Sequence, residues 1–166
     1  MGSGVTGYEK TGRCVTCDAR IVPQYAFMNR RRAREYVLKL LFQFEFTGSR
    51  VDLFSPQDFW PQEKDAEELR GFAGELFKGT IEHIEEIDRV IQAAAEHWEL
   101  QRMAAVDRNI IRLAVFEILF RKDIPPAASI NEALEIAKKY SAQEAVPFIN
   151  GLLDRVSKEA GRQGEK

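Results

Sequence analysis

The chain has 166 residues, of which 45% are hydrophobic and 30% are charged, and its net charge at pH 7 is −2. This length fits one ordinary domain and excludes a large two-domain enzyme. The hydrophobic content excludes a chain that is disordered throughout. The longest strongly apolar stretch, residues 113–120, is far shorter than the roughly 20 residues that span a bilayer. Since no signal-like N-terminus is present either, we expect a cytoplasmic protein without a membrane span.

Residues 1–28 lack the helical periodicity that most of the chain shows. Their two cysteines, Cys14 and Cys17, form a single Cys-x-x-Cys pair, whereas a structural zinc site needs four ligands. No strand–helix unit accompanies the pair, so a thioredoxin-type redox site is not expected either. We therefore expect no metal and no cofactor. We interpret residues 1–28 as a disordered extension or an artefact of expression or start-site choice, residues 29–158 as the folded domain, and residues 159–166 as a polar tail.

Charge is divided unevenly along the sequence. Residues 29–50 carry a balance of +4, whereas residues 51–166 carry a balance of −7. Such asymmetry indicates that the basic end binds a polyanion, and it also suits a basic protein partner for the acidic body.

After residue 28, apolar residues recur at helical spacing and no alternating strand pattern of useful length occurs, which predicts an all-α protein. The first helix is expected to begin near Asn29 and to end near Gly48. Aromatic residues of the connection 48–64 should pack against the core; they are Phe54, Phe59 and Trp60. Residues 65–98 predict one long helix or two consecutive ones, with a break near Gly79 and with Trp98 at the end of the buried stripe.

Apolar residues cover almost every face of residues 107–120, which predicts that this helix lies at the centre of the fold. Two capping-box patterns follow, Ser129 with Glu132 and Ser141 with Glu144, and each predicts the start of a further helix. Pro147 fits only the first turn of the second of these helices, so its start is expected two or three residues later than the box suggests. The polar end of the last helix is expected to fray from Lys158.

The sequence contains no motif that catalysis would require. It has no Walker-type phosphate loop, no Gly-x-Ser-x-Gly and no His-Glu-x-x-His. The carboxylates of residues 82–88 are most simply a solvated helix face. We therefore do not expect an enzyme.

The first helix carries the most informative pattern. Arginines crowd its first turn at Arg30, Arg31, Arg32 and Arg34, where the helix dipole disfavours cations by some 0.3–1 kcal/mol each. Helix stability therefore does not explain them. At about 100° per residue, Phe42 points roughly 160° away from the buried stripe, on the side of Arg31, with Glu35 and Leu38 alongside.

An exposed ring beside arginines is the arrangement that stacks unpaired bases while guanidinium groups hold phosphates. Two alternatives remain open from the sequence. The arginines could serve only solubility, and Phe42 could pack beneath the connection 48–64.

Four segments resemble the NusB family of transcription antitermination proteins. They are residues 30–36 (RRRAREY), 105–114 (AVDRNIIRLA), 129–138 (SINEALEIAK) and 148–154 (FINGLLD). They follow one another in family order and with family-like spacing. The resemblance implies an all-helical fold of about six to seven helices in two small subdomains. It also implies a non-catalytic adaptor that binds the boxA element of nascent ribosomal RNA together with NusE, a small-subunit ribosomal protein, within an RNA polymerase antitermination complex.

The resemblance also implies roles for particular residues. The four arginines match the family's RNA-binding motif, and Phe42 falls where many relatives have a tyrosine. Asp107 matches an acidic position linked to RNA and partner binding, although an N-cap role explains it equally well. Glu144 matches a position on the NusE side. Asn150 and Gly151 are family signatures that we interpret as structural, through helix packing and backbone contacts.

Two other functions remain as alternatives. NusB-like domains also occur as accessory RNA-binding modules fused to ribosomal RNA cytosine methyltransferases, although no methyltransferase domain or catalytic cysteine motif is found in these 166 residues. The third hypothesis is a structural helical dimer that buries the basic face. A homodimer would be compatible with the family.

Overall fold

The computed structural model describes residues 22–47, 66–95 and 98–164. Within these ranges it contains α-helices and one short 3-10 helix, and no strand. The elements are α1 (Val22–Thr47), α2 (Ala66–Glu82), α3 (Ile84–Ala94), η1 (Leu100–Arg102), α4 (Ala105–Phe120), α5 (Pro126–Tyr140) and α6 (Ala145–Gly164). The prediction of an all-α fold is confirmed. None of the helices in the described ranges has the length and hydropathy needed to cross a membrane.

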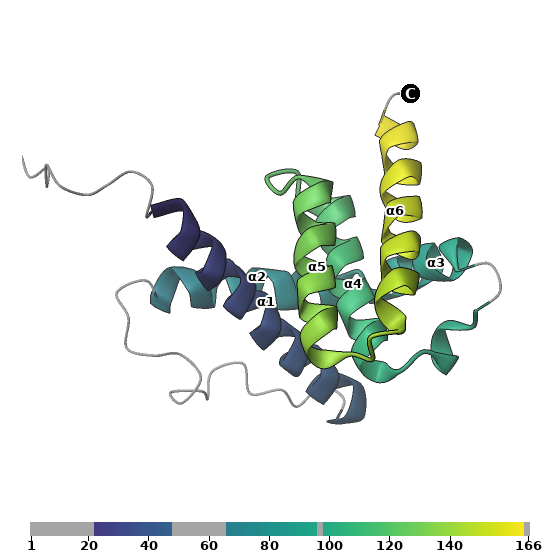
Figure 1. Cartoon of the computed structure of the whole chain (residues 1–166), viewed down its shortest axis with the longest axis horizontal. Helices are drawn as coiled ribbons and strands as arrows, with labels where there is room; N and C mark the ends of the chain where they lie inside the picture. The colour runs from purple at the N-terminus through teal and green to yellow at the C-terminus, as the bar shows by residue number, and fades with distance from the viewer. Residues whose placement is uncertain (1–21, 48–65, 96–97, 165–166) are drawn as a thin grey trace, which may run out of the picture.

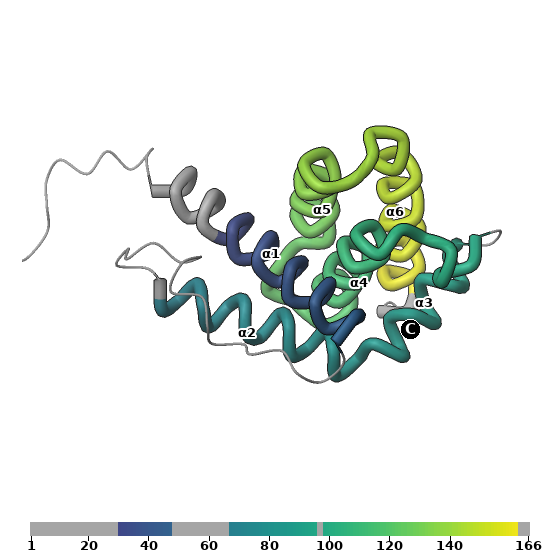
Figure 2. Tube along the Cα trace, turned by 90° about the horizontal axis from the view of Figure 1, so that it is seen from below, coloured from purple at the N-terminus to yellow at the C-terminus, as the bar shows by residue number. Residues whose placement is uncertain are grey.

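Helix α4 lies at the centre of the fold, as predicted. It contacts each of the other five α-helices of the described chain, and its ten consecutive residues from Arg108 to Glu117 are buried. Figure 1 shows α4, α5 and α6 standing side by side, with α1 and α2 together on the opposite side of α4 from α6. Figure 2 shows α1 lying along α2. The core therefore forms around α4, and every surface helix is positioned by it.

Helix α2 approaches α4 closely just before the break between α2 and α3. A Cβ atom added to Gly79 would lie 2.2 Å from the Phe116 ring of α4, so only glycine lets α2 come this near. Four residues later, His83 ends α2 with its Nδ1 atom 2.9 Å from the Gly79 carbonyl oxygen, and its ring centroid lies 4.1 Å from that of Phe120. The predicted break near Gly79 is confirmed.

Several expected boundaries are wrong. Helix α1 begins at Val22, seven residues before Asn29, and α6 stays helical to Gly164 instead of fraying from Lys158. Trp98 is 57% exposed and does not complete the buried stripe. Residues 1–21 and the connection 48–64 lie outside the described residues.

The first capping-box prediction is also wrong. Helix α5 begins at Pro126 with Pro125 as its N-cap residue, because proline at the first helical position needs no hydrogen bond from its missing N–H group. Ser129 and Glu132 are therefore buried inside the helix. The second box does not cap α6 either, because Ser141 is the C-cap residue of α5 and its hydroxyl donates to Asp107. Helix α6 begins at Ala145, which agrees with the later start expected from Pro147.

Candidate RNA interface

One face of α1 is joined to α5 by ion pairs and hydrogen bonds. Arg31 donates from Nε and Nη2 to the two carboxylate oxygens of Glu132, at 2.9 and 2.8 Å. One turn later, Glu35 accepts hydrogen bonds from Lys139 Nζ at 2.7 Å and from Tyr140 Oη at 2.9 Å. Residue numbers rise together on both helices, so α1 and α5 run in the same direction. This face of α1 is therefore covered as far as the end of α5.

Because α5 covers only part of this face of α1, Leu38 and Phe42 on the same face differ in exposure. Leu38 is only 4% exposed and lines a small cavity with Ala133 and Ile136 of α5, so the expectation that it lies beside Phe42 on an open face is wrong. Helix α5 ends at Tyr140, beside Glu35. Phe42 lies seven residues farther along α1, or about 10 Å, and is 38% exposed. The predicted exposure of Phe42 is confirmed, because α5 stops before reaching it.

The four predicted arginines fall into two groups. Arg34 is 6% exposed and donates from Nε and Nη2 to both carboxylate oxygens of buried Glu117, at 2.7 and 3.0 Å. Ser129 donates a third hydrogen bond to Glu117 at 2.7 Å. Arg34 therefore neutralises a carboxylate inside the protein, and its guanidinium is not available to a phosphate at the surface.

Arg30 and Arg32 remain at the surface. The guanidinium of exposed Arg30 lies 5.4 Å from the centroid of the Phe72 ring on α2, within the range of a cation–π contact. Arg32 is half-buried. Neither residue forms an ion pair with another described residue. Arg31 is intermediate, since its side chain is 39% exposed but already pairs with Glu132, whose hydrogen bond raises the pKa of Arg31.

A second cationic group lies close to Arg30, in the α4–α5 connection. Arg121 sits 5.6 Å from the same Phe72 ring and donates to both carboxylate oxygens of Asp123 at 2.8 and 2.9 Å. These hydrogen bonds lower the pKa of Asp123 to about 2. Lys122 between them is exposed. Arg121 also donates to Glu75 of α2 at 2.9 Å, so two carboxylates offset its charge and this connection adds little to the basic end of α1.

The acidic candidates lie where α4, α5 and α6 meet. Asp107 is in the first turn of α4 and accepts a hydrogen bond from the hydroxyl of Ser141, the C-cap residue of α5. The N-cap of α4 is Ala104, so the N-cap interpretation of Asp107 is wrong. Glu144 is exposed just before α6. Asp107 and Glu144 therefore mark the end of the molecule at which α4 and α6 begin.

The interpretation of Gly151 as a packing residue is not supported. It is exposed on α6, and a Cβ atom added there would meet nothing within 4 Å. Asn150 beside it is half-buried.

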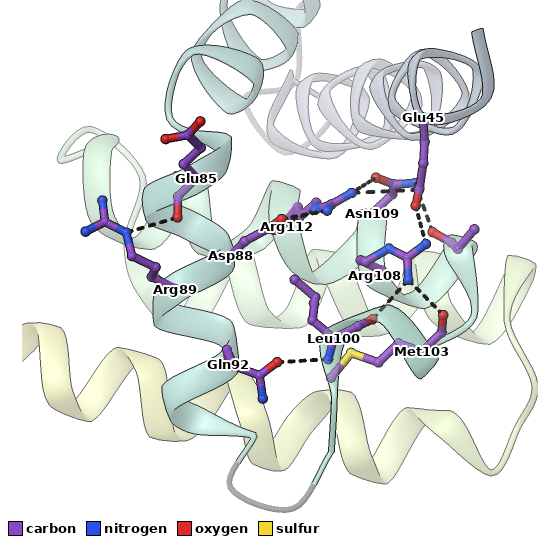
Figure 3. Close-up of polar contacts among 11 residues, drawn as sticks. Glu45, Glu85, Asp88, Arg89, Gln92, Leu100, Met103, Arg108, Asn109 and Arg112 are labelled. Atoms are coloured by element: carbon purple, nitrogen blue, oxygen red, sulfur yellow. Dashed lines mark hydrogen bonds and ion pairs between the residues drawn. The ribbon is translucent and has the colours of Figure 1, made fainter. Parts of the chain in front are cut away.

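A network of buried arginines and half-buried carboxylates that sequence reasoning missed joins α1 to α4 and α3 (Figure 3). Glu45 of α1 accepts hydrogen bonds from Arg108 Nη2 and from Asn109 Nδ2, the latter at 2.7 Å. Arg112 donates from Nε and Nη2 to the two carboxylate oxygens of Asp88 on α3, both at 2.7 Å. This network fixes the C-terminal end of α1, the end that carries Phe42.

A signal for this network was present in the sequence. Arg108, Asn109 and Arg112 lie within the helix predicted to be central and surrounded by other helices. Buried charges need partners, because leaving one unpaired costs several kcal/mol. The pattern therefore required carboxylates from neighbouring helices, although it could not name them.

The arrangement of these residues is consistent with what comparison with known proteins shows. The sequence model of the NusB family matches residues 31–158. Over 144 residues the chain is 45% identical to transcription antitermination protein NusB of Thermodesulfovibrio yellowstonii, covering 80% of this chain and 93% of that protein. Over 140 residues it is 50% identical to the protein of the same name from Desulfitobacterium hafniense, covering 84% of this chain and 95% of that protein.

Solved structures agree with the sequence matches. T. maritima NusB superposes with a TM-score of 0.68 at 40% identity, covering 78% of this chain and 91% of that chain. A crystal structure of the antitermination factors NusB and NusE in complex with dsRNA gives a TM-score of 0.64 at 28% identity, covering 80% of this chain and 98% of that chain. The resemblance that four sequence segments indicated is thereby confirmed, and the chain belongs to the NusB family.

Proposed function

We propose that this protein is a non-catalytic transcription antitermination factor that binds boxA-containing RNA together with NusE. The observation that carries the proposal is the surface of α1, where Arg30, Arg32 and the exposed ring of Phe42 lie on one helix. Membership of the NusB family supports it, as does the likeness to a NusB protein solved with NusE and RNA.

The RNA side of the proposal follows from the chemistry of these groups. Arg30 and Arg32 offer guanidinium groups to phosphate oxygens, which gives affinity without sequence preference. Phe42 offers a flat apolar face to an unpaired base. Arg34 and Glu117 hold the helix in place from beneath. The buried Arg34 therefore keeps α1 rigid, while Arg30 and Arg32 at its surface contact RNA.

The partner side of the proposal uses the acidic body. Residues 51–166 carry a balance of −7, and ribosomal proteins such as NusE are generally basic. We infer that NusE docks at the end of the molecule marked by Asp107 and Glu144. Complementary charge of this kind speeds association and selects the partner. Joint binding then presents RNA with a larger surface than either protein offers alone.

The methyltransferase alternative is less well supported. The two curated relatives described above are antitermination proteins, and the chain covers 93% and 95% of their length. A helical dimer that buries α1 predicts instead that RNA does not bind, so the RNA titration described next distinguishes the two functions.

The test is a titration of boxA RNA and of a scrambled RNA of equal length against the protein alone and against its mixture with NusE. We expect boxA to bind more tightly than the scrambled RNA and NusE to increase the affinity, with a reciprocal gain in NusE affinity when RNA is present. Equal affinity with and without NusE would contradict joint binding. Lys158→Ala, at an exposed position on α6, a helix that Figure 1 shows on the opposite side of α4 from α1, serves as the control and should change neither.

A further inference from the structure

Two exposed phenylalanines lie one turn apart at the C-terminal end of α1. Phe42 is 38% exposed and Phe46 is 68% exposed, the largest value among the exposed large hydrophobic residues of the described chain. Their ring centroids are 4.8 Å apart and the ring planes are inclined by 49°. Burial of such a side chain contributes about 1.5–3 kcal/mol, and neither ring gains all of it here. Packing against the residues that the structure describes therefore does not account for this pair.

The rings are carried by a firmly held part of the helix. Glu45, next to Phe46, accepts hydrogen bonds from Arg108 and Asn109 of α4. Thr47 donates from Oγ1 to the carbonyl oxygen of Gln43 at 2.8 Å. The end of α1 is thus tied to the core on its inner side while the two rings point outward. Preorganised aromatic side chains of this kind bind with a small entropy cost.

Three side chains follow one another along α1, and the last of them is Phe46, the more exposed of the two rings. Arg32, Lys39 and Phe46 follow one another at intervals of seven residues, which places them within about 40° of one another around α1 and about 10 Å apart along it. The neighbouring face that carries Arg31 and Glu35 is covered by α5. The line of Arg32, Lys39 and Phe46 lies beside that cover, with Arg32 half-buried and the other two exposed.

The charges around the rings favour a polyanion. The two described carboxylates of α1 are Glu35 and Glu45, and both are engaged, the first by α5 and the second by α4. The exposed residues of α1 around the rings are Lys39, Gln43 and Thr47, and none of them is acidic. A basic protein would instead be attracted to the acidic end at Asp107. Flat apolar groups joined by negative charges are what single-stranded RNA presents.

We propose that Phe42 and Phe46 together form a stacking site for two neighbouring unpaired bases of single-stranded RNA, with the phosphates of that strand running along Lys39 and Arg32. This inference rests on the proposed RNA-binding function and extends it to Phe46, the last aromatic residue of α1. Base stacking on an aromatic ring tolerates any base. The site therefore adds affinity and register, while sequence preference comes from other contacts.

The experiment measures binding of boxA RNA by fluorescence anisotropy for wild type, Phe46→Ala, Phe46→Leu and Phe46→Tyr. We expect Phe46→Ala to weaken binding roughly 5- to 150-fold, the range measured for loss of one stacked base, without changing the salt dependence. Phe46→Leu keeps apolar bulk but loses the aromatic face, so it should be nearly as weak. Phe46→Tyr should bind like wild type. Gln43→Ala, at an exposed neighbour of the rings, is the matched control.

RNAs with one abasic nucleotide at each position in turn identify the stacked base. At one position the abasic RNA should reproduce the loss seen for Phe46→Ala, and the two changes together should cost no more than either alone. Because Phe46 is exposed, each variant should melt within a few degrees of wild type.

Three outcomes would overturn the inference. Full RNA affinity in Phe46→Ala, combined with a loss in Arg32→Ala or Phe42→Ala, would leave RNA binding intact and remove Phe46 from it. Rescue by Phe46→Leu would mean a simple apolar contact instead of stacking. A loss of NusE affinity without a loss of RNA affinity would assign the ring to a protein interface. If boxA RNA fails to bind the wild-type protein at all, the proposed function itself is wrong.

Discussion

Arg34 and Glu117 face each other in the interior, where α1 crosses α4, and two hydrogen bonds of 2.7 and 3.0 Å join the guanidinium to the carboxylate. The two residues are 83 positions apart in the chain and are 6% and 1% exposed. This pair separates Arg34 from the three arginines before it. A run of four arginines in sequence is therefore not four equivalent phosphate contacts.

The first prediction concerns this pair. Arg34→Ala should lower the free energy of unfolding by about 3–5 kcal/mol, because it leaves the Glu117 carboxylate buried without its cation. Urea unfolding monitored by circular dichroism measures the change. Replacing both partners, as in Arg34→Met with Glu117→Leu, should recover much of the loss. Normal stability of Arg34→Ala together with weakened RNA binding would show that Arg34 contacts phosphate after all.

The surface arginines should behave differently. Arg30→Ala and Arg32→Ala should each weaken boxA and scrambled RNA alike, and each should reduce the slope of log affinity against log salt by about 0.7 on a single strand. Binding isotherms at several salt concentrations give the slopes. The Lys158→Ala control should leave the slope unchanged. A loss confined to boxA would mean that these arginines read bases instead of phosphates.

Arg31 tests whether a carboxylate of the protein competes with RNA. In the free protein, Glu132 occupies both Nε and Nη2 of Arg31. Glu132→Gln removes that negative charge, so RNA affinity should rise by about 1.5- to 5-fold, the equivalent of one partly exposed ion pair. Arg31→Ala combined with Glu132→Gln should show no such gain. Weaker RNA binding in Glu132→Gln would mean that the carboxylate instead positions Arg31 for RNA.

Glycine at position 79 gives a prediction about packing. Gly79→Ala places a methyl group 2.2 Å from the Phe116 ring, and overpacking of this kind costs typically about 1–3 kcal/mol. Gly74→Ala on the same helix meets no atom within 4 Å, so it should be stabilising by about 0.5–1 kcal/mol through helix propensity. Thermal unfolding of the two variants should move in opposite directions. A stable Gly79→Ala variant would contradict the close approach of α2 and α4.

The pairing of Asp123 with Arg121 gives a prediction about pH. Hydrogen bonds from Arg121 lower the pKa of Asp123 from 3.8 to about 2, so its charged form is favoured in the folded protein. The pair therefore stabilises the fold above pH 3.8 and loses its contribution as the pH falls through about 2. Carboxyl carbon NMR across this range measures the midpoint, and Arg121→Leu should return it toward 3.8. A wild-type midpoint near 3.8 would contradict the pairing.

Sequence periodicity predicted well what depends on neighbours along the helix. The buried side of α1, with Ala33, Val37 and Leu41 at 0–1% exposure, followed from spacing alone, as did the central position of α4. Exposure of Phe42 followed from the same arithmetic. These features need only the geometry of one helix, so a single sequence contains them.

Partners distant in the chain could not be predicted in this way, and the α5 capping box shows why. Ser129 and Glu132 have the spacing of a local cap, but Ser129 donates to Glu117 and Glu132 accepts from Arg31, 101 positions away. Burial makes these long-range pairs stronger than a cap at an exposed helix end. The two residues that looked like a helix start thus hold the arginine-rich helix in place.

The position at which α5 ends decides where the face of α1 that α5 covers becomes open. Helix α5 ends at Tyr140, whose hydroxyl meets Glu35, and the open part of that face of α1 starts beyond this point. Adding a helical turn to the end of α5 would move this boundary toward Phe42, and removing one would move it back toward Arg31. The length of nucleic acid that α1 can bind is therefore set by α5, a helix that need not contact the nucleic acid.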